Sequence, residues 1–526
     1  DAIAIASDGV VTMNQIPVLS AGLNVSGGTI AGTIATATQN SITTMTGLTT
    51  VGAGGTASAV AGIPFFSADT GSIYTHDVSG TDDTANYNSA YGITALDAVT
   101  TGDNNNAFGY GALGANNTGY DNVAVGHNAL LLNTGGHDNV AIGNGTLDAN
   151  TTGNNNTAIG RVALGANTTG DHNLAIGQSA LAANTTGTRN TAIGYQAYDG
   201  SDTENDNLAI GYQAMTTDTA GGTRNIAVGN YALDALTSGD DNVVVGYDAG
   251  SAITTGGSNT LVGRDAGKTA TTVSGNTAVG DSALKINVAE YNTAVGAFAL
   301  DSNTTGATNT AVGYGALDAN STAEYNTAIG AYALVAATTG SYNTALGRSA
   351  GLAITTGTRN IAIGVDTLKA VTTGVDNTAV GTNAASATTG DGNVAVGKSA
   401  LNANTSGNLN VAIGKLALTA NTTAENNVAV GYNAAGSNTT GTRNTAIGYG
   451  AYDSSDTEND NLAIGHLAMT ANTAGGTKNV AVGNYAGDEI TSGDSQTLVG
   501  YGAGHQITSA SNNVCLGEDA GASLTT

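Results

Sequence analysis

The chain of 526 residues has few of the side chains that build a conventional globular core. It contains two prolines, one cysteine and no tryptophan, and aromatic residues make up 5% of the total. A single cysteine, Cys515, excludes an internal disulfide framework. The length alone would suggest several domains, but the scarcity of large apolar side chains disfavours a series of globular cores.

Basic residues are equally scarce. The chain has 13 Lys+Arg against 40 Asp+Glu, which gives a formal net charge of −27. Because binding to phosphates requires clustered Lys and Arg, this balance excludes nucleic-acid recognition and electrostatic attachment to anionic membranes. No apolar run approaches the roughly 18 residues that a membrane-spanning helix needs, so we expect no membrane insertion. The first ten residues lack the basic start and long apolar stretch of a signal peptide.

The composition instead reflects a short internal repeat, in which the string Asn-Thr-Ala-Ile-Gly returns along the chain. Its glycine, here called the key glycine, occurs 26 times between Gly92 and Gly517. Those 425 residues make 25 steps, so the mean period is 17; two steps are 18 residues long and two are 16. A fixed period with such rare slippage predicts a solenoid, in which each repeat forms one coil.

The unit 156–172 shows the positions that define the repeat: Asn156, Ala158, Ile159, Gly160 and Ala163. Asn stands four residues before the key glycine in 25 of the 26 units. Gly and β-branched residues at fixed places disfavour a helix. We therefore predict two short strands and one Asn-Thr-Thr-Gly turn per coil.

Three expectations follow for the packing of these coils. Ile and Val of the strand should form an apolar stripe inside the coil, and Ala should permit close approach of sheets or of chains. The Asn side chains should either form an amide ladder from coil to coil or satisfy the local backbone of a turn. A coil this thin buries little surface by itself, which favours a homotrimer.

The predicted fold is therefore an all-β parallel β-roll or solenoid of about 26 coils with a 17-residue period. We divide the chain into an N-terminal attachment or shaft region, residues 1–87, and a repeat rod, residues 88–526. The block 187–232 returns nearly unchanged at 441–486, which is 254 residues later. Such duplication is consistent with a rod that lengthens by adding coils.

The string A-[IV]-G-x-x-A, as in Ala192–Ala197 and Ala446–Ala451, resembles the head repeats of trimeric autotransporter adhesins of the YadA type. The resemblance covers residues 88 to about 521. It implies a left-handed parallel β-roll with three chains packed around one axis. The period of that family is nearer 14–15 residues, and the additional residues here fall in the Asn-Thr-Thr-Gly loop.

A second resemblance concerns residues 1–50, which are similar to the shaft regions of tail fibres from environmental, often marine, phages. The strings IASDGVVTMNQIPVL and ATQNSITTMTGL carry it. Such fibres frequently contain the A-I-G repeat. This resemblance implies an extracellular virion component that mediates attachment to a host, joined at one end to a virion or cell-surface assembly.

No pattern in the sequence predicts an enzyme, and we expect no catalytic residues and no cofactor. The six histidines lack the spacing of a zinc site, and neither a nucleophile elbow nor a P-loop is present. Paired carboxylates such as Asp202 with Glu204, and Asp456 with Glu458, lack the cleft that a glycosidase needs. Asp- and Asn-rich loops supply oxygen ligands suited to Ca²⁺, but they match no calcium motif, and solvated acidic turns explain them more simply.

The residue after the key glycine is the strongest candidate for surface contacts, because tyrosine recurs there. Rows of tyrosine could bind glycans or proteins, since each ring combines a large contact area with a polar tip. The alternative is a ladder of rings that supports adjacent coils. The residues concerned are Tyr110, Tyr195, Tyr212, Tyr247, Tyr314, Tyr432, Tyr449 and Tyr501.

The sequence thus favours a structural and attachment fibre, a homotrimer that binds a host cell-surface glycan or protein. A phage tail or virion fibre is the first expectation, and a bacterial trimeric surface adhesin is the alternative of the same class. An ice- or ligand-binding single-chain β-solenoid is the alternative of a different class. It would use the Thr pairs of the loops, such as Thr168 and Thr169, as a flat array.

Overall fold

The computed structural model describes residues 84–525 apart from residues 201, 218–220 and 473–474, together with five short strands before residue 84. The chain divides into two units, Asp1–Gly54 and Gly55–Thr526. In the first unit β1 (Ala4–Ile5) pairs antiparallel with β2 (Val11–Thr12). In the second, β3 (Ser58–Val60) pairs antiparallel with β4 (Ile63–Phe65). The remainder of the predicted attachment region, residues 1–87, lies largely outside the described residues.

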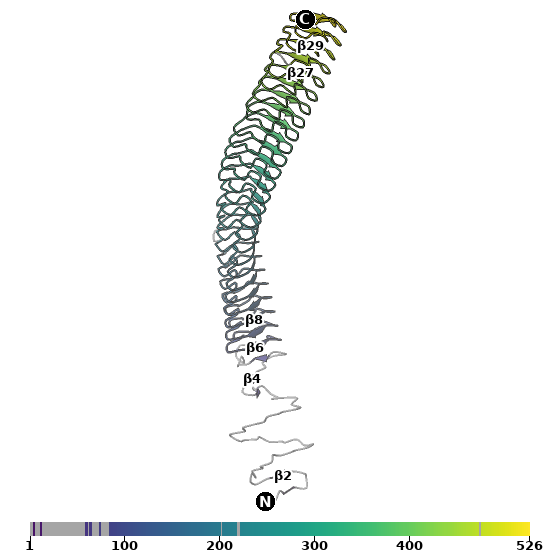
Figure 1. Cartoon of the computed structure of the whole chain (residues 1–526). Helices are drawn as coiled ribbons and strands as arrows, with labels where there is room; N and C mark the ends of the chain where they lie inside the picture. Colours follow the sequence, from purple (N-terminus) through teal and green to yellow (C-terminus); the bar gives the residue numbers. More distant parts are fainter. Residues whose placement is uncertain are drawn as a thin grey trace. The chain divides into compact units, whose positions relative to one another are not determined.

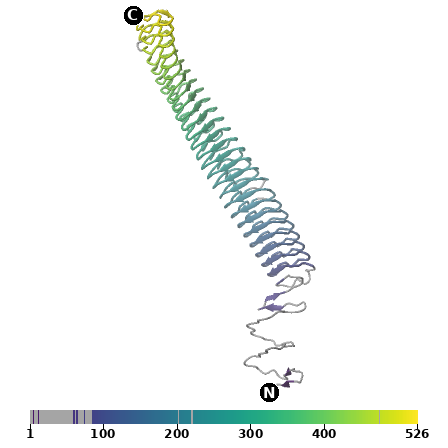
Figure 2. The ribbon, with the colours of Figure 1, turned by 90° about the vertical axis from the view of Figure 1, so that its right-hand side faces the viewer.

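The second unit contains one long ladder of parallel strands that begins at β5 (Ile73–Tyr74). Each later strand pairs in register with the next one along the chain, and the key glycine follows each strand from β6 onward. Figure 1 and Figure 2 show the coils of this ladder stacked in chain order, with the strands side by side. The predicted all-β parallel solenoid with a 17-residue period is confirmed.

The remaining strands of the ladder have nearly uniform lengths of three residues. Their bounds are β6 (Ser89–Tyr91), β7 (Asn106–Phe108), β8 (Val123–Val125), β9 (Val140–Ile142), β10 (Thr157–Ile159), β11 (Leu174–Ile176), β12 (Thr191–Ile193), β13 (Leu208–Ile210), β14 (Ile226–Val228), β15 (Val243–Val245), β16 (Thr260–Val262), β17 (Thr277–Val279), β18 (Thr293–Val295), β19 (Thr310–Val312), β20 (Thr327–Ile329), β21 (Thr344–Leu346), β22 (Ile361–Ile363), β23 (Thr378–Val380), β24 (Val394–Val396), β25 (Val411–Ile413), β26 (Val428–Val430), β27 (Thr445–Ile447), β28 (Leu462–Ile464), β29 (Val480–Val482), β30 (Thr497–Val499) and β31 (Val514–Leu516).

Each coil contains one strand rather than the two that we predicted. The second segment, for example Tyr110–Leu113, alternates between left-handed and ordinary backbone, with φ of 64° at Gly111 and 52° at Leu113. A strand cannot form through such alternation, because its residues must all be extended. The amides still pair between coils: Gly111 donates to Ile93 at 3.0 Å and Leu113 to Ala129 at 2.9 Å. The coil therefore keeps its backbone hydrogen bonds while it turns.

The interior of the coil is lined by alanine and leucine, and the expected inner stripe of Ile and Val is wrong. In the coil around Gly160, Ala158, Ala163 and Leu164 are fully buried, whereas Ile159 is 37% exposed. A three-residue strand points only its central side chain inward, because successive side chains alternate between the two faces. The narrow interior accommodates Ala at that central position, and the flanking β-branched residues face outward.

The key glycine closes the corner after each strand. Its φ lies between 131° and 147° from Gly92 to Gly500, a region that residues with a Cβ rarely adopt. A Cβ on Gly160 would lie 2.4 Å from the carbonyl oxygen of Gly177 in the next coil. The key glycine is thus required both by its backbone conformation and by the close approach of the next coil.

Two columns of buried asparagine hold neighbouring coils together. In the first column, Asn156 Nδ2 donates to Gly170 O at 2.8 Å, and its Oδ1 accepts from the Asn173 amide at 2.9 Å. In the second, Asn167 Nδ2 donates to Asn150 Oδ1 at 2.8 Å and to the same Gly170 O. The asparagines therefore combine both roles that the sequence left open, the ladder between coils and the satisfaction of local backbone.

Volume changes inside the coil compensate one another where the repeat varies. Gly250 and Gly267 take the position usually held by the buried leucine, and Leu261 replaces the strand alanine beside them. A Cβ on Gly267 would lie 2.8 Å from Leu261 Cδ1, so the enlarged side chain occupies the space that the missing one leaves. Close packing of this kind keeps the coil outline constant along the ladder.

Candidate interaction surface

The tyrosines that follow the key glycine all lie on the surface, where each is 40–53% exposed. Several of them stack on aromatic neighbours one coil away. Ring centroids lie 5.2 Å apart in Tyr110–His127, Tyr195–Tyr212 and Tyr432–Tyr449, with interplanar angles of 17°, 11° and 15°. The rings therefore form short ladders while their outer edges and hydroxyl groups remain open to contact.

The ladders also include rings that the sequence did not single out. Tyr231, Phe298, Tyr332 and Tyr485 stand two residues after a key glycine instead of one. Tyr314 packs edge-on against Phe298 at 5.7 Å and against Tyr332 at 5.4 Å. Comparing the positions one and two residues after the key glycine would have found these rings, since these four coils lack an aromatic residue at the first position and have one at the second.

The outward face of the strand ladder is the most continuous exposed apolar surface on the described coils. The residue before the key glycine is Ile or Val in most coils, and many of these side chains are more than a third exposed, such as Ile142, Ile159 and Ile413. Two residues earlier stands Thr, Val, Leu or Ile in all of these coils but the first two, which have Ser89 and Asn106, and this side chain faces the same way. Such a face lacks charge and can bury apolar area against a partner.

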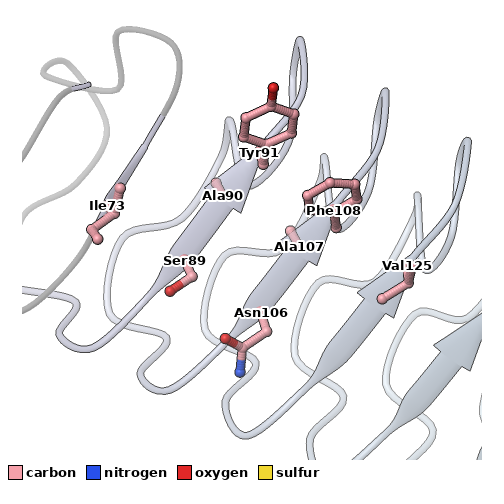
Figure 3. A pocket seen from close by; sticks show the side chains of 8 residues that line it. All are labelled: Ile73, Ser89, Ala90, Tyr91, Asn106, Ala107, Phe108 and Val125. Atoms are coloured by element: carbon pink, nitrogen blue, oxygen red, sulfur yellow. The ribbon is translucent and has the colours of Figure 1, made fainter. Parts of the chain in front are cut away.

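At the start of the ladder this face carries aromatic rings and is hollowed. Tyr91 and Phe108 take the place of Ile or Val, and their rings stack with centroids 4.8 Å apart and an interplanar angle of 9°. Figure 3 shows them in one row with Val125, and Ile73, Ser89 and Asn106 in a second row along the hollow. The lining is predominantly apolar and contains no titratable side chain besides the Tyr91 phenol.

The duplicated block contains a buried carboxylate, one of the paired acids noted in the sequence. Glu458 is 3% exposed, and its Oε2 accepts hydrogen bonds from Ser455 Oγ at 2.7 Å and from the amides of Asp456 and Thr457 at 3.0 Å. Its Oε1 accepts from the Gly475 amide at 3.1 Å. This carboxylate closes a turn and joins two coils, so its chemistry here is structural.

A buried tyrosine accompanies this glutamate. Tyr452 replaces the usual leucine, and its hydroxyl accepts from Asn461 Nδ2 at 2.6 Å. Burial raises the pKa of Tyr452 well above its usual range. Tyr198 and Glu204 occupy the same positions in the first copy of the block and are likewise buried. The block thus repeats its internal structure as well as its sequence.

We predict that Glu458→Gln loosens this turn in a pH-dependent way. Burial raises the pKa of Glu458, but the hydrogen bonds from Ser455 and the backbone outweigh it and hold the pKa below its ordinary value. A lowered pKa means stability that is present above the unfolded value of about 4.3 and lost as the pH falls through the folded value. At pH 7 the variant should lose about 1–3 kcal/mol of local stability.

Hydrogen exchange of peptides spanning 452–476 measures this effect, with wild type and variant compared at each pH. The difference should be full at pH 7 and shrink below about pH 4. The exposed Glu290→Gln is the control and should change nothing. A difference that persists at pH 3 would contradict the role of the Glu458 charge.

Ion pairs join successive coils on the surface. Arg189, Arg224, Arg359 and Arg443 each hold the aspartate one coil later, with Nε–Oδ1 distances of 2.6 Å. The Arg443 guanidinium lowers the pKa of the Asp460 carboxyl by its hydrogen bond. These exposed pairs are weak stabilisers individually, but they leave those basic groups engaged with acids of the same chain.

The threonine pairs of the loops do not form a doubled array of free hydroxyls. The first threonine donates to the backbone of the next coil, as in Thr168 Oγ1 to Thr185 O at 3.0 Å and Thr151 Oγ1 to Thr168 O at 3.0 Å. The second, such as Thr169, is exposed. The exposed threonines of successive loops therefore form one outer row.

Neither a metal-binding cluster nor a membrane-spanning helix is found in the part of the chain that the structure describes. Its His, Cys, Asp and Glu side chains form no group of three or more that could hold a metal ion. No helix there is long and apolar enough to cross a membrane. A scan against models of protein families gives no match, and a search of curated proteins gives no significant match.

Proposed function

We propose that this protein is a structural and attachment fibre whose strand faces associate around one axis as a homotrimer. The observation that carries the proposal is the row of outward Ile and Val side chains along the ladder. A monomer would leave this long apolar face in water, whereas three copies could bury it together. The coil interior, filled mainly by Ala, Leu and Asn, offers little further apolar area.

The role is mechanical: the fibre projects from an assembly and contacts a host surface. The repeated coils add length without new chemistry, and repeated weak contacts gain strength by avidity. A phage tail or virion fibre in an extracellular setting agrees with the resemblance of residues 1–50. A bacterial trimeric adhesin would use the same strand face, and the surface features of the rod do not separate the two.

Absolute mass in solution tests the assembly. Light scattering on the purified chain should give three times 51.2 kDa, and negative-stain images should show thin rods. A mass of 51.2 kDa at micromolar concentration would overturn the trimer. It would also leave the strand face free for the alternative, a single-chain ice- or ligand-binding solenoid.

If the protein is such a single-chain solenoid, one stretch of the strand face is a better candidate for its binding array than the loops are. Six consecutive strands, β16 to β21, begin with Thr and end with Val, Ile or Leu. Their side chains face outward in two straight rows, one coil apart along each row. Thermal hysteresis of a monomeric rod would support ice binding through these rows, and its absence would remove this alternative.

A further inference from the structure

The two copies of the duplicated block, each with the coil that follows it, carry the same row of surface aromatic rings. The first row, called track 1, consists of Tyr195, Tyr212, Tyr231 and Tyr247. The second, called track 2, consists of Tyr449, His466, Tyr485 and Tyr501. Each ring of track 2 lies 254 residues after its counterpart in track 1, and in both tracks each ring contacts the next across one coil step.

The ring geometry of the two tracks is similar at every step. The first two rings stack, with centroids 5.2 Å apart and angles of 11° in track 1 and 12° in track 2. The third ring turns, making angles of 72° and 88° with its neighbours in track 1 and of 68° and 74° in track 2. The planes of the stacked rings lie across the long axis of the ladder. The plane of the third ring, nearly perpendicular to theirs, therefore runs along that axis.

Both tracks place the turned ring two residues after the key glycine. Asn230 and Asn484 occupy the position directly after the key glycine, and their Oδ1 atoms accept from the amides of Tyr212 and His466 at 2.9 Å. The aromatic ring stands at the next residue, Tyr231 or Tyr485. Phe298 and Tyr332 stand at the same position and also pack edge-on, against Tyr314, so the turned orientation goes with this position in the coil.

The backbone at the turned ring does not favour an aromatic residue. Tyr231 and Tyr485 have φ of 60° and 58°. Asn, Asp and Gly tolerate this left-handed conformation best, and they occupy the equivalent position in other coils, for example Asn128, Asp248 and Gly111. Tyr231 and Tyr485 are themselves half-buried at the surface, and the fully buried interior of the coils is formed by other residues.

The chemistry of the tracks suits an uncharged ligand with alternating apolar and hydroxyl surfaces. Their rings bear no formal charge apart from the titratable His466. A net charge of −27 disfavours polyanions over the whole rod. A sugar ring can place its C–H face on an aromatic face and its hydroxyl groups near phenol oxygens, and an extended chain can follow a row of rings.

We propose that tracks 1 and 2 are two copies of a binding site for a neutral polysaccharide chain that lies along the rod. The inference rests on the proposed attachment role and names the class of ligand for it. The sites are fifteen coil steps apart, from Gly194 to Gly448, or about 70 Å at the spacing of β-strands. A long polymer can engage both sites, so binding gains from avidity.

The test removes the turned ring while preserving the backbone. Tyr231→Asn and Tyr485→Asn introduce a residue that occupies this position elsewhere in the chain, as at Asn128, Asn383 and Asn433. The matched control is Tyr342→Asn. Tyr342 is 58% exposed and stacks on Tyr325 at 5.1 Å, but it belongs to neither track. Its column also contains asparagine in other coils, for example Asn155 and Asn426.

Affinity electrophoresis of the full chain in gels containing hydroxyethylcellulose, galactomannan or dextran gives the readout, with polyacrylamide alone as the reference. At least one of these neutral polymers should retard the wild-type protein. Each single variant should weaken the apparent affinity about 10-fold to 100-fold, and the double variant should lose retardation. Tyr342→Asn should behave as wild type, and thermal unfolding should be alike for all four variants.

The proposal is overturned if no neutral polymer retards the wild type, or if Tyr342→Asn weakens binding as much as the track variants. Binding of a proline-rich peptide at the tracks with no polysaccharide binding would also overturn it. Failure here is distinct from failure of the fibre. A trimer of normal mass without retardation ends this inference alone, whereas a monomer that binds through its tracks ends the trimeric fibre alone.

Discussion

Gly313→Ala should split the rod into two stacks of coils. A Cβ at this key glycine would lie 2.6 Å from the carbonyl carbon and 2.7 Å from the carbonyl oxygen of Gly330, and φ is 135°. Both contacts are with backbone, so no side chain can move aside to relieve them. We expect a local cost of at least about 3 kcal/mol from the combined backbone strain and steric clash.

Because each coil contacts only its neighbours, this cost acts at one step of the ladder rather than on the whole rod. Limited proteolysis should therefore cut the variant near residues 313–330 and yield two resistant fragments, whereas the wild type stays intact. Gly315→Ala is the matched control, since its φ is 59° and its Cβ would meet only the Tyr332 ring at 3.4 Å. Its cost should be about 1 kcal/mol.

Equal resistance of the two variants to protease would contradict the role assigned to the key glycine. It would mean that the next coil can shift away from the added Cβ at little cost. The same experiment on Gly414, with φ of 132° and a Cβ contact of 2.3 Å to Gly431 O, repeats the test at another coil.

The second large effect concerns the strand face. Ile329→Cys should link two chains covalently through a short bis-maleimide, because this side chain, 38% exposed in the single chain, would lie near the axis of the proposed trimer. The background is Cys515→Ala, which removes the buried native thiol and places there the residue that most coils have at this position. Denaturing electrophoresis should show a species at twice 51.2 kDa.

Thr339→Cys provides the control for that reaction. It lies in the exposed loop of the same coil, away from the strand. Its thiol should react with the reagent but link no chains, since the loops would face away from the axis. A linked species from Thr339→Cys and none from Ile329→Cys would place the interface on the loops and refute the strand-face trimer.

Repetition in the sequence was sufficient to predict the solenoid, its period and its number of coils. Asparagine at a fixed place in nearly every unit left two roles open, a ladder between coils and a local turn, and the structure combines them. The recurring glycine lies at the corner after each strand. The Tyr column is also visible in the sequence. These features are periodic, and a period along the chain becomes a column in space once coils stack in register.

The direction of the strand side chains was not predictable from the same pattern. Period-2 alternation says that Ala158 and Ile159 face opposite ways, but not which of them faces inward. The usual preference for burying the larger apolar side chain gives the wrong answer here. Tertiary packing decides, since Leu164 and Asn167 share the coil interior with Ala158 and all three are fully buried. Ile159 is then left on the surface that a partner chain could cover.

The second strand was wrongly predicted, and the aromatic tracks were not foreseen, for a related reason. Residues 110–113 turn instead of extending because Gly111 and Leu113 have left-handed backbone. This conformation is unfavourable for an isolated leucine, and the fit between adjacent coils imposes it. The tracks combine rings from two sequence columns, because Tyr231 and Tyr485 stand two residues after the key glycine and their neighbours stand one residue after it. The sequence by itself determined the repeat and the ladder, and the contacts between stacked coils decided which side chains reach the surface together.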